Sequence, residues 1–212
     1  MKTAVIPEFF ARLAAAIPEP ETELEYENVY HLLVAVVLSA QATDIGVNRA
    51  TGPLFKTIKT PAQMVALGEK KLIDHIKTIG LFRTKARNVI GLSHLLIERH
   101  GGEVPRTHEE LLALPGVGRK TANVVMNVAF GEATIAVDTH IFRVGNRTGL
   151  APGKNPLQVE LKLLKRVPAE YRMHAHHWLI LHGRYTCKAR TPLCPGCVVA
   201  DLCTFKGKTT AA

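Results

Sequence analysis

The chain has 212 residues, of which 47% are hydrophobic, so it can bury the core of one large domain or two small ones. Its longest apolar run, from Leu32 to Leu38, is too short to cross a bilayer, which excludes a membrane-spanning protein. The 27 lysines and arginines outnumber the 18 aspartates and glutamates, and the resulting net charge of +9 favours a polyanionic partner, most often nucleic acid. A positive surface that only keeps the chain in solution is the alternative.

The sequence predicts helices almost throughout, because apolar residues recur at helical spacing and strand patterns are nearly absent. The segment 28–38 is apolar on all sides and is expected in a core. Asp44 and Asp138 are expected helix N-caps, and Thr107 with Glu110 has the spacing of a capping box. Residues 133–137 form an apolar connector. The expected helices span residues 7–16, 28–38, 44–56, 61–67, 69–77, 83–99, 107–113, 118–130, 138–147, 156–165 and 171–185.

No secretory or targeting segment and no low-complexity tract is visible, so we expect an intracellular, cytoplasmic protein with reduced cysteines. No internal repeat with a period of about 20–50 residues is present. The short basic tail from Lys206 to Ala212 is expected to fray.

All four cysteines of the chain lie close together near its C-terminus: Cys187, Cys194, Cys197 and Cys203. Four thiols in one short segment suit a soft metal centre, and an iron–sulfur cluster is the favoured interpretation. A structural zinc site normally uses two tight Cys-x-x-Cys pairs, whereas this segment has one such pair with wider arms on both sides. Zinc and a pair of disulfides remain the alternatives, although the missing secretory signal disfavours disulfides.

A second motif reads Leu114-Pro115-Gly116-Val117-Gly118 and is followed by Arg119-Lys120-Thr121-Ala122. It connects the expected helices 107–113 and 118–130. Its glycines permit a tight turn and a close approach of the backbone to a ligand. The first amides of the second helix are suited to a phosphate. A plain helix–turn–helix connector is the alternative.

These motifs, together with Val137-Asp138-Thr139-His140, resemble the endonuclease III family from about residue 28 to residue 203. Members of this family are helix–hairpin–helix DNA glycosylases with an abasic-site lyase activity. The resemblance implies a two-lobed all-α fold, with residues 22–132 as the hairpin lobe and residues 1–21 plus 133–212 as the cluster lobe. It also implies a [4Fe–4S] cofactor, and a monomer that binds damaged or abasic duplex DNA between the lobes and is nucleoid-associated when bound.

The resemblance gives Lys120 the role of nucleophile and Asp138 the role of stabilising positive charge at the sugar. Without it, Lys120 would be interpreted as a phosphate contact and Asp138 as an ordinary helix cap. Gln41 matches a residue that fills the hole left by a flipped base, and Leu81 matches an apolar wedge. The other expected site residues are Gly116, Val117, Gly118, Arg119, Lys188 and Arg190 for DNA, and Asp44 and His140 for the base pocket.

The expected function is therefore removal of oxidised or ring-saturated pyrimidines from DNA in base excision repair, through a lysine Schiff base and β-elimination. One alternative is a glycosylase of the same fold that acts on another base. The branch of this fold that removes adenine lacks the hairpin lysine, so Lys120 argues against that specificity. A specificity for mismatched thymine or uracil stays open. The other alternative is a non-enzymatic helix–hairpin–helix DNA-binding module with a structural metal.

Overall fold

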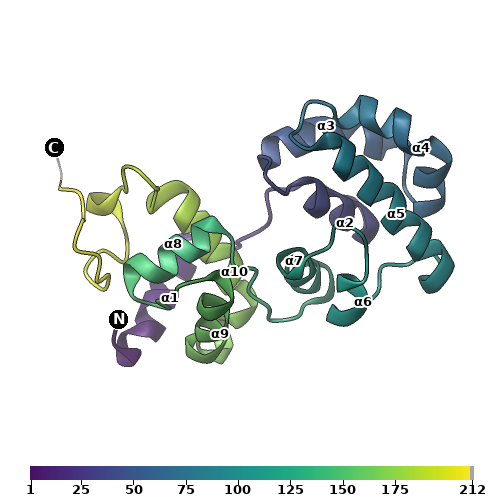
Figure 1. Cartoon of the computed structure of the whole chain (residues 1–212). Coiled ribbons are helices and arrows are strands. Elements are labelled where there is room, and N and C mark those ends of the chain that lie inside the picture. Colours follow the sequence, from purple (N-terminus) through teal and green to yellow (C-terminus); the bar gives the residue numbers. More distant parts are fainter. Residues whose placement is uncertain (211–212) are drawn as a thin grey trace. The chain divides into compact units, whose positions relative to one another are not determined.

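The structure is a computed structural model that describes residues 1–210, and within that range it contains helices and no strand (Figure 1). This confirms the predicted all-α class. Ala211 and Ala212, the end of the tail that was expected to fray, lie outside the described residues. No helix in the described range is long and apolar enough to cross a membrane. The α-helices are α1 (Ile6–Ala16), α2 (Val29–Leu38), α3 (Asp44–Thr57), α4 (Pro61–Ile76), α5 (Phe82–His100), α6 (His108–Leu112), α7 (Arg119–Phe130), α8 (Thr139–Thr148), α9 (Pro156–Arg166) and α10 (Arg172–Leu181).

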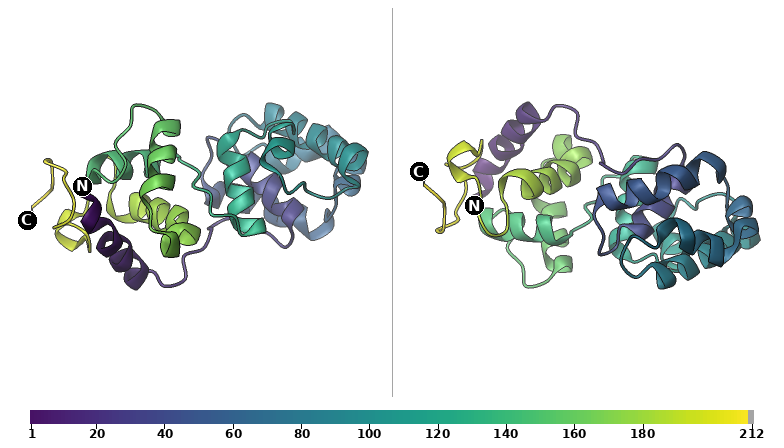
Figure 2. Two further views of the ribbon diagram at one scale, coloured as in Figure 1. Left: turned by 90° about the horizontal axis from the view of Figure 1, so that it is seen from below. Right: turned by 90° about the horizontal axis from the view of Figure 1, so that it is seen from above.

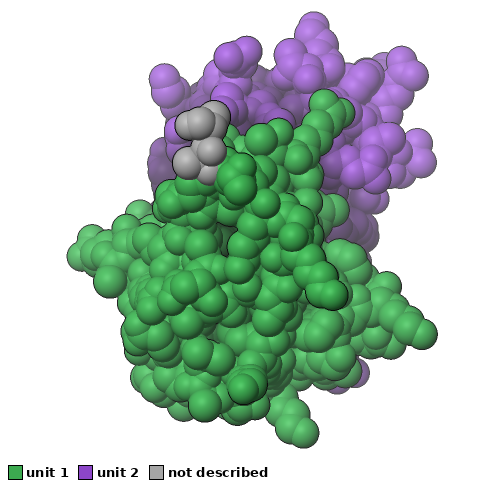
Figure 3. All heavy atoms as spheres, turned by 90° about the vertical axis from the view of Figure 1, so that its left-hand side faces the viewer, with its two compact units in different colours: residues 1–21, 132–212 green, residues 22–131 purple. Residues whose placement is uncertain are grey.

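The chain divides into two compact units, which Figure 3 colours separately. One unit contains residues 22–131 and therefore α2 to α7. The other combines residues 1–21 with the chain from residue 132 onward, so that α1 shares a unit with α8, α9 and α10.

The unit of residues 22–131 is built around α2. Every residue of α2 from Tyr30 to Leu38 is buried, which confirms the core helix expected from its apolar sequence. Helices α3, α5 and α7 pack against α2, and α4 packs along α5. This arrangement leaves the turn before α7 and the segments before α3 and α5 at the surface of the unit.

In the other unit, α1 buries one apolar face against helices from the C-terminal half of the chain. Phe10 packs against the rings of Tyr171 and Trp178, and the indole nitrogen of Trp178 donates to the carbonyl of Ile17 at 2.8 Å. Figure 2 shows α1 beside the C-terminal segment in both views, where Arg12 pairs with Asp201 at 2.7 Å. The N-terminal helix is thus held against segments from the C-terminal half of the chain.

The predicted N-cap of α3 was wrong by one residue. The hydroxyl of Thr43 accepts the amide of Gly46 at 3.1 Å, so Thr43 caps the helix and Asp44 is its first residue. Thr43 has the extended backbone that a cap requires, with φ −83° and ψ 147°. The carboxylate of Asp44 still lies in the first turn, where the helix dipole favours negative charge.

The predicted N-cap of α8 is confirmed, and the predicted capping box of α6 is confirmed in part. Asp138 caps α8, since its Oδ1 accepts the amide of Ile141 at 2.8 Å, as predicted. Thr107 caps α6 by accepting the amide of Glu110 at 3.3 Å. The Glu110 carboxylate, however, accepts the hydroxyl of Thr107 at 2.6 Å, so only the Thr107 half of the predicted capping box is present.

Glycine interrupts α4 as the sequence predicted. The two expected helices meet at Gly68, whose φ of 80° and ψ of 159° break an otherwise continuous element. A full capping box, which the sequence analysis did not identify, begins this helix at Thr60 and Gln63. The last predicted helix is divided as well: α10 ends at Leu181 and a π-helical turn, His182–Thr186, leads directly to the first cysteine.

Candidate functional site

The turn between α6 and α7 buries its apolar residues and exposes its glycines. Leu114 and Val117 are buried, and the amide of Val117 donates to the carbonyl of Leu114 at 3.1 Å. Gly116 and Gly118 are exposed, and Gly118 is the N-cap of α7. No side chain caps this end of α7. The hairpin therefore presents the N-terminus of α7 at the surface, a geometry that suits an anion.

Gly116 is required for the shape of this turn, so we predict that Gly116→Ala destabilises the protein. Its φ is +78°, and a Cβ at this position would lie 2.8 Å from Cβ and Nδ2 of Asn88 on α5. Backbone strain and the clash together are expected to cost about 1–3 kcal/mol of unfolding free energy. Chemical denaturation measures this cost.

Gly118→Ala is the matched control, because Gly118 has φ −98° and a Cβ there would meet no atom within 4 Å. Loss of a glycine cap is expected to cost less than about 1 kcal/mol. Equal destabilisation by the two substitutions would show that the turn does not depend on the backbone conformation of Gly116.

The two residues predicted to carry the chemistry begin two different helices. Lys120 is the second residue of α7, and its side chain is exposed. Asp138 is the N-cap of α8 and is partly buried. Lys120 belongs to the unit of residues 22–131 and Asp138 to the other unit.

Gln41 and Leu81 have an unusual backbone conformation in common. They are the two non-glycine residues of the described chain with positive φ, 54° for Gln41 and 59° for Leu81. This conformation is rare for residues with a side chain and is costly for leucine. Both residues are exposed, Leu81 to 57%. The sequence predicted two exposed loop residues but gave no sign of their backbone strain.

The segments that carry Gln41 and Leu81 lie next to each other in the unit of residues 22–131. A Cβ built on Gly80 would lie 3.8 Å from the carbonyl oxygen of Gln41, and one built on Gly46 would lie 3.8 Å from Cγ2 of Ile79. We call residues 39–42 and 78–81 the paired loops. The two exposed residues with strained backbones thus lie on neighbouring loops, and Asp44 lies just beyond the first loop.

The four cysteines line one cavity in the other unit. Residues from α8, the π-helical turn and the C-terminal segment complete its largely apolar wall, among them Arg147, His182 and Phe205. None of the four thiols forms a disulfide. Burial raises the pKa of the Cys197 and Cys203 thiols and thus disfavours their thiolate forms. A bound metal centre would offset this effect, because it binds the thiolates. The predicted disulfide alternative is therefore absent from the structure.

Four thiols that line one cavity suit a metal centre with thiolate ligands. A structural zinc site and an iron–sulfur cluster both use such ligands. The spacing of the cysteines, with one tight pair and wider arms, favours the cluster.

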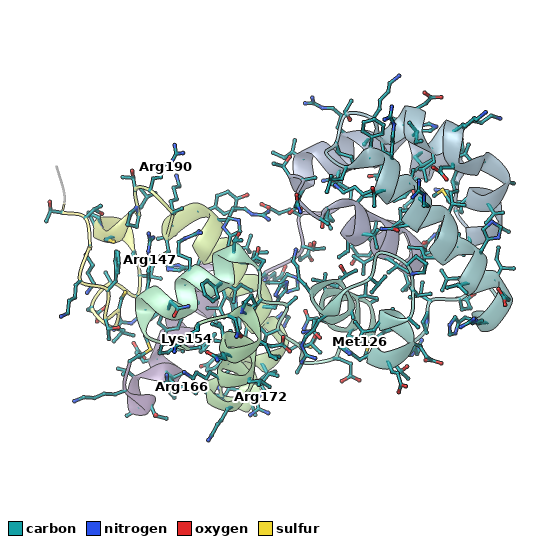
Figure 4. The ribbon with its side chains drawn as sticks, in the orientation of Figure 1. Met126, Arg147, Lys154, Arg166, Arg172 and Arg190 are labelled. Atoms are coloured by element: carbon teal, nitrogen blue, oxygen red, sulfur yellow. The ribbon has the colours of Figure 1, made fainter. Side chains whose placement is uncertain are left out.

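Arg147 of α8 holds the backbone of the first cysteine segment. Its guanidinium donates to the carbonyls of Lys188 and Ala189 at 2.6 and 2.7 Å, and its Nη1 lies 3.8 Å from Sγ of Cys187. The same group lies over the ring of Phe205, 4.8 Å from the centroid. Figure 4 shows Arg147 between α8 and the C-terminal segment. The sequence analysis did not identify this residue, because a helical arginine gives no local signal of such contacts.

Lys188 and Arg190 project from the loop that Arg147 fixes. Both are exposed, and Figure 4 shows Arg190 at the outer edge of the C-terminal segment. The amides of Lys188 and Leu193 both donate to the carbonyl of Thr186, at 2.9 and 2.8 Å, which closes the loop at its base. Two exposed cations on a fixed backbone suit phosphate contacts.

His140 and His182 lie near the cluster segment but outside the cysteine set. Nδ1 of His140 lies 3.2 Å from Nη2 of Arg143, which also donates to the carbonyl of Gly183 at 2.7 Å. His182 lines the cavity with its Nε2 3.9 Å from Sγ of Cys197, and burial lowers its pKa to about 4. The sequence analysis missed His182. Its position five residues before Cys187, within a π-helical turn, places both residues at the cavity.

Comparison with known proteins places most of the chain in one superfamily. Residues 34–169 match the HhH-GPD superfamily of base excision DNA repair proteins, and residues 187–203 match the iron–sulfur binding domain of endonuclease III. The chain is 58% identical to endonuclease III of Escherichia coli strain K12 over 95% of each chain. It is 56% identical to endonuclease III of Treponema pallidum over 92% of each chain.

Solved structures give the same result. A trapped endonuclease III–DNA covalent intermediate superposes with a TM-score of 0.91 at 45% identity, covering 96% of each chain. A non-covalent endonuclease III–DNA complex gives the same values. A thermostable thymine-DNA glycosylase shares the fold, with a TM-score of 0.83 at 24% identity.

The iron–sulfur match begins at Cys187 and ends at Cys203, and all four cysteines line the cavity described above. The match indicates the [4Fe–4S] cluster that this family carries, for which the four cysteines are the candidate ligands. Because the hairpin, the start of α8 and the cysteine segment all lie within these matches, the chain belongs to the endonuclease III family of base excision DNA repair proteins.

Proposed function

We propose that the chain is a bifunctional DNA glycosylase that removes oxidised or ring-saturated pyrimidines from duplex DNA and then cuts the strand at the resulting abasic site. The observation that carries this proposal is the 58% identity with Escherichia coli endonuclease III over 95% of the chain, which includes the Lys120 hairpin and Asp138. The covalent DNA intermediate trapped with a relative supports a nucleophile supplied by the protein.

Lys120 is the proposed nucleophile. Its amine attacks C1′ of the sugar while the bond from C1′ to the damaged base breaks, and the base leaves with the bonding electrons and takes up a proton. The amine nitrogen and C1′ then form a Schiff base as the nitrogen gives up a proton, the C1′–O4′ bond of the sugar ring breaks and O4′ takes up a proton; the Schiff base makes a hydrogen on C2′ acidic. Removal of that proton expels the 3′ phosphate by β-elimination and cuts the strand. The exposed position of Lys120 at the start of α7 is compatible with access to the sugar.

Asp138 is proposed to stabilise the positive charge that develops at the sugar as the base departs. Its bond to the amide of Ile141 fixes the carboxylate at the start of α8, so that the charge is held in place before the substrate arrives. In this proposal Asp138 is both the helix cap and a catalytic residue. His140, two residues further along α8, and Asp44 are the proposed pocket residues.

The paired loops are proposed to open the duplex. A base cannot react inside the stack, so it must be flipped out, and the hole and the kink that result need support. Gln41 is proposed to fill the hole, and Leu81 to wedge between bases. Their strained backbone supports this role, because such conformations persist mainly where function requires them.

Leu81→Ala is expected to slow excision of a damaged base from duplex DNA by about tenfold or more, because the wedge that compensates for unstacking is lost. Binding to undamaged duplex should change little. Single-turnover excision and fluorescence anisotropy measure the two effects. Ile97→Ala, which removes another exposed side chain of the same unit, is the control. Equal losses in excision and in nonspecific binding would contradict the wedge.

Phosphate contacts are proposed at two places. The hairpin residues Gly116, Val117, Gly118 and Arg119 offer a close approach of the turn, the start of α7 and a cation to one stretch of DNA backbone. Lys188 and Arg190 offer two cations from the cluster loop. Contacts of this kind position the enzyme without reading sequence. The cluster itself, held by four thiolates, has no open coordination position and serves to shape this loop.

The proposal also covers organisation and location. Residues 22–132 are assigned to the hairpin lobe and residues 1–21 plus 133–212 to the cluster lobe. The enzyme is proposed to act as a monomer inside the cell on damaged or abasic duplex DNA, which its net charge of +9 favours.

Borohydride trapping tests the reaction with three duplexes that contain thymine glycol, an abasic site or a mismatched thymine. Reduction of the Schiff base should leave a covalent adduct with the first two. An adduct with abasic DNA but not with thymine glycol would retain the lyase and overturn the base specificity, and one with the mismatched thymine would identify the alternative substrate. No adduct with any duplex would overturn the proposed function in favour of a monofunctional glycosylase or a DNA-binding module.

A further inference from the structure

Lys85 on α5 is a buried cation with no partner. It is 4% exposed, and it is the one lysine or arginine among the buried residues of the described chain. Its Nζ is buried and makes no hydrogen bond. Burial lowers the pKa of this amine, since water no longer stabilises the charge. Fully buried lysines are rare without a partner, because the desolvation of an unpaired charge opposes folding.

The position of Lys85 makes the charge more costly still. Its own backbone amide donates to the carbonyl of Leu81 at 3.0 Å and so forms the first turn of α5. A cation in this turn lies near the positive end of the helix dipole. The Cα–Cβ bonds of a helix incline toward its N-terminus, so that of Lys85 is directed toward the end of α5 that follows Leu81.

Three unfavourable features therefore meet in one small region. Gln41 and Leu81 have strained backbones, and Lys85 has a buried, unpaired charge. The paired loops touch where Gly80 approaches the carbonyl oxygen of Gln41. Natural sequences depart from local rules mainly at functional sites, and here none of the three features stabilises the free protein. A partner that is acquired only on DNA binding would account for all three.

We propose that Lys85 is a positioning residue for the paired loops. When the loops enter the duplex, its ammonium donates to their backbone carbonyls and so fixes the directions of Gln41 and Leu81. The free enzyme carries the unpaired charge, and the bound enzyme satisfies it. This inference rests on the proposed function, because it requires that the loops enter DNA.

The sign of the stability change distinguishes this role from ordinary packing. Lys85→Met keeps the length of the side chain and removes the charge, so its thermal unfolding midpoint should equal or exceed that of the unsubstituted protein. Lys70→Met, at an exposed position on α4, is the matched control and should leave the midpoint unchanged. A lower midpoint for Lys85→Met would show that the side chain stabilises the protein by packing, and it would contradict the proposal.

The activity readouts separate base extrusion from chemistry. Lys85→Met should lower the single-turnover rate of thymine glycol excision from duplex DNA by about tenfold or more. Borohydride trapping on an abasic site in single-stranded DNA, which has no base to extrude, should change by less than about twofold. Lys85→Arg retains the charge and its donors and should restore most of the duplex rate.

Two results would overturn the inference while leaving the proposed function intact. One is that Lys85→Met excises the damaged base from duplex DNA as fast as the unsubstituted protein does. The other is a parallel loss on duplex and single-stranded substrates with no recovery in Lys85→Arg. Failure of the unsubstituted protein to form any adduct would instead remove the proposed function and this inference with it.

Discussion

Lys120→Ala is expected to abolish the borohydride-trapped adduct on abasic duplex DNA and to reduce strand cleavage by about a thousandfold or more. Alanine has no amine with which to form the Schiff base, so the covalent route is lost rather than slowed. Lys120 is exposed in the second position of α7, and its loss should change stability by less than about 0.5 kcal/mol. The lost activity would then be chemical in origin.

Two further variants test whether the activity lost in Lys120→Ala is due to the amine of Lys120 itself. Lys71→Ala removes an exposed lysine of α4 in the same unit and should leave both adduct and cleavage intact. Arg119→Ala removes the neighbouring cation and is expected to weaken binding to duplex DNA without preventing the adduct. If Lys120→Ala still formed the adduct, another amine would be the nucleophile. If it lost only affinity, Lys120 would be a phosphate contact, the role that its sequence position alone would suggest.

Features that depend on a few neighbouring residues could be predicted from the sequence. The break at Gly68, the cap at Asp138 and the burial of all sides of α2 each follow from local composition and were confirmed. The choice of Asp44 over Thr43 as a cap failed because both residues are good caps, and only the backbone conformation decides between them.

Features that depend on distant segments were not predictable in this way. Nothing in the sequence around Lys85 shows that its amine is buried, since burial depends on how α5 packs in the folded unit. Arg147 likewise meets the carbonyls of Lys188 and Ala189 across 41 and 42 residues of chain. The positive φ of Gln41 and Leu81 is also set by the tertiary structure, because neither residue type favours it.

The cysteine set was predictable in part from the sequence. Its four members fall within 17 residues, so the sequence showed that they belong together. It could not show that the four thiols line one cavity together with Arg147, His182 and Phe205, which lie outside the cysteine segment. A ligand set is thus predictable from spacing, whereas the wall around it requires the folded chain.

Cys194→Ser is expected to lose most of the iron and acid-labile sulfide and to lower the thermal unfolding midpoint. Serine is a poor ligand for a soft metal centre, and metal binding contributes directly to the folding of the segment that supplies the ligands. Cys194 follows the loop of Lys188 and Arg190 and is the first residue of the tight Cys-x-x-Cys pair, so loss of the cluster should also release that loop. Affinity for undamaged duplex DNA should fall as these two cations lose their fixed positions.

Thr191→Ala is the matched control, because it changes an exposed, uncharged residue of the same loop and leaves all four thiols in place. It should retain iron, sulfide, the unfolding midpoint and DNA affinity. Iron content, thermal unfolding and anisotropy titrations provide the measurements. A Cys194→Ser protein that lacks iron yet unfolds at the unsubstituted temperature and binds DNA equally well would contradict the structural role. Arg147 would then be sufficient to hold the loop, since its bonds to the carbonyls of Lys188 and Ala189 and its contact with the ring of Phe205 do not involve Cys194.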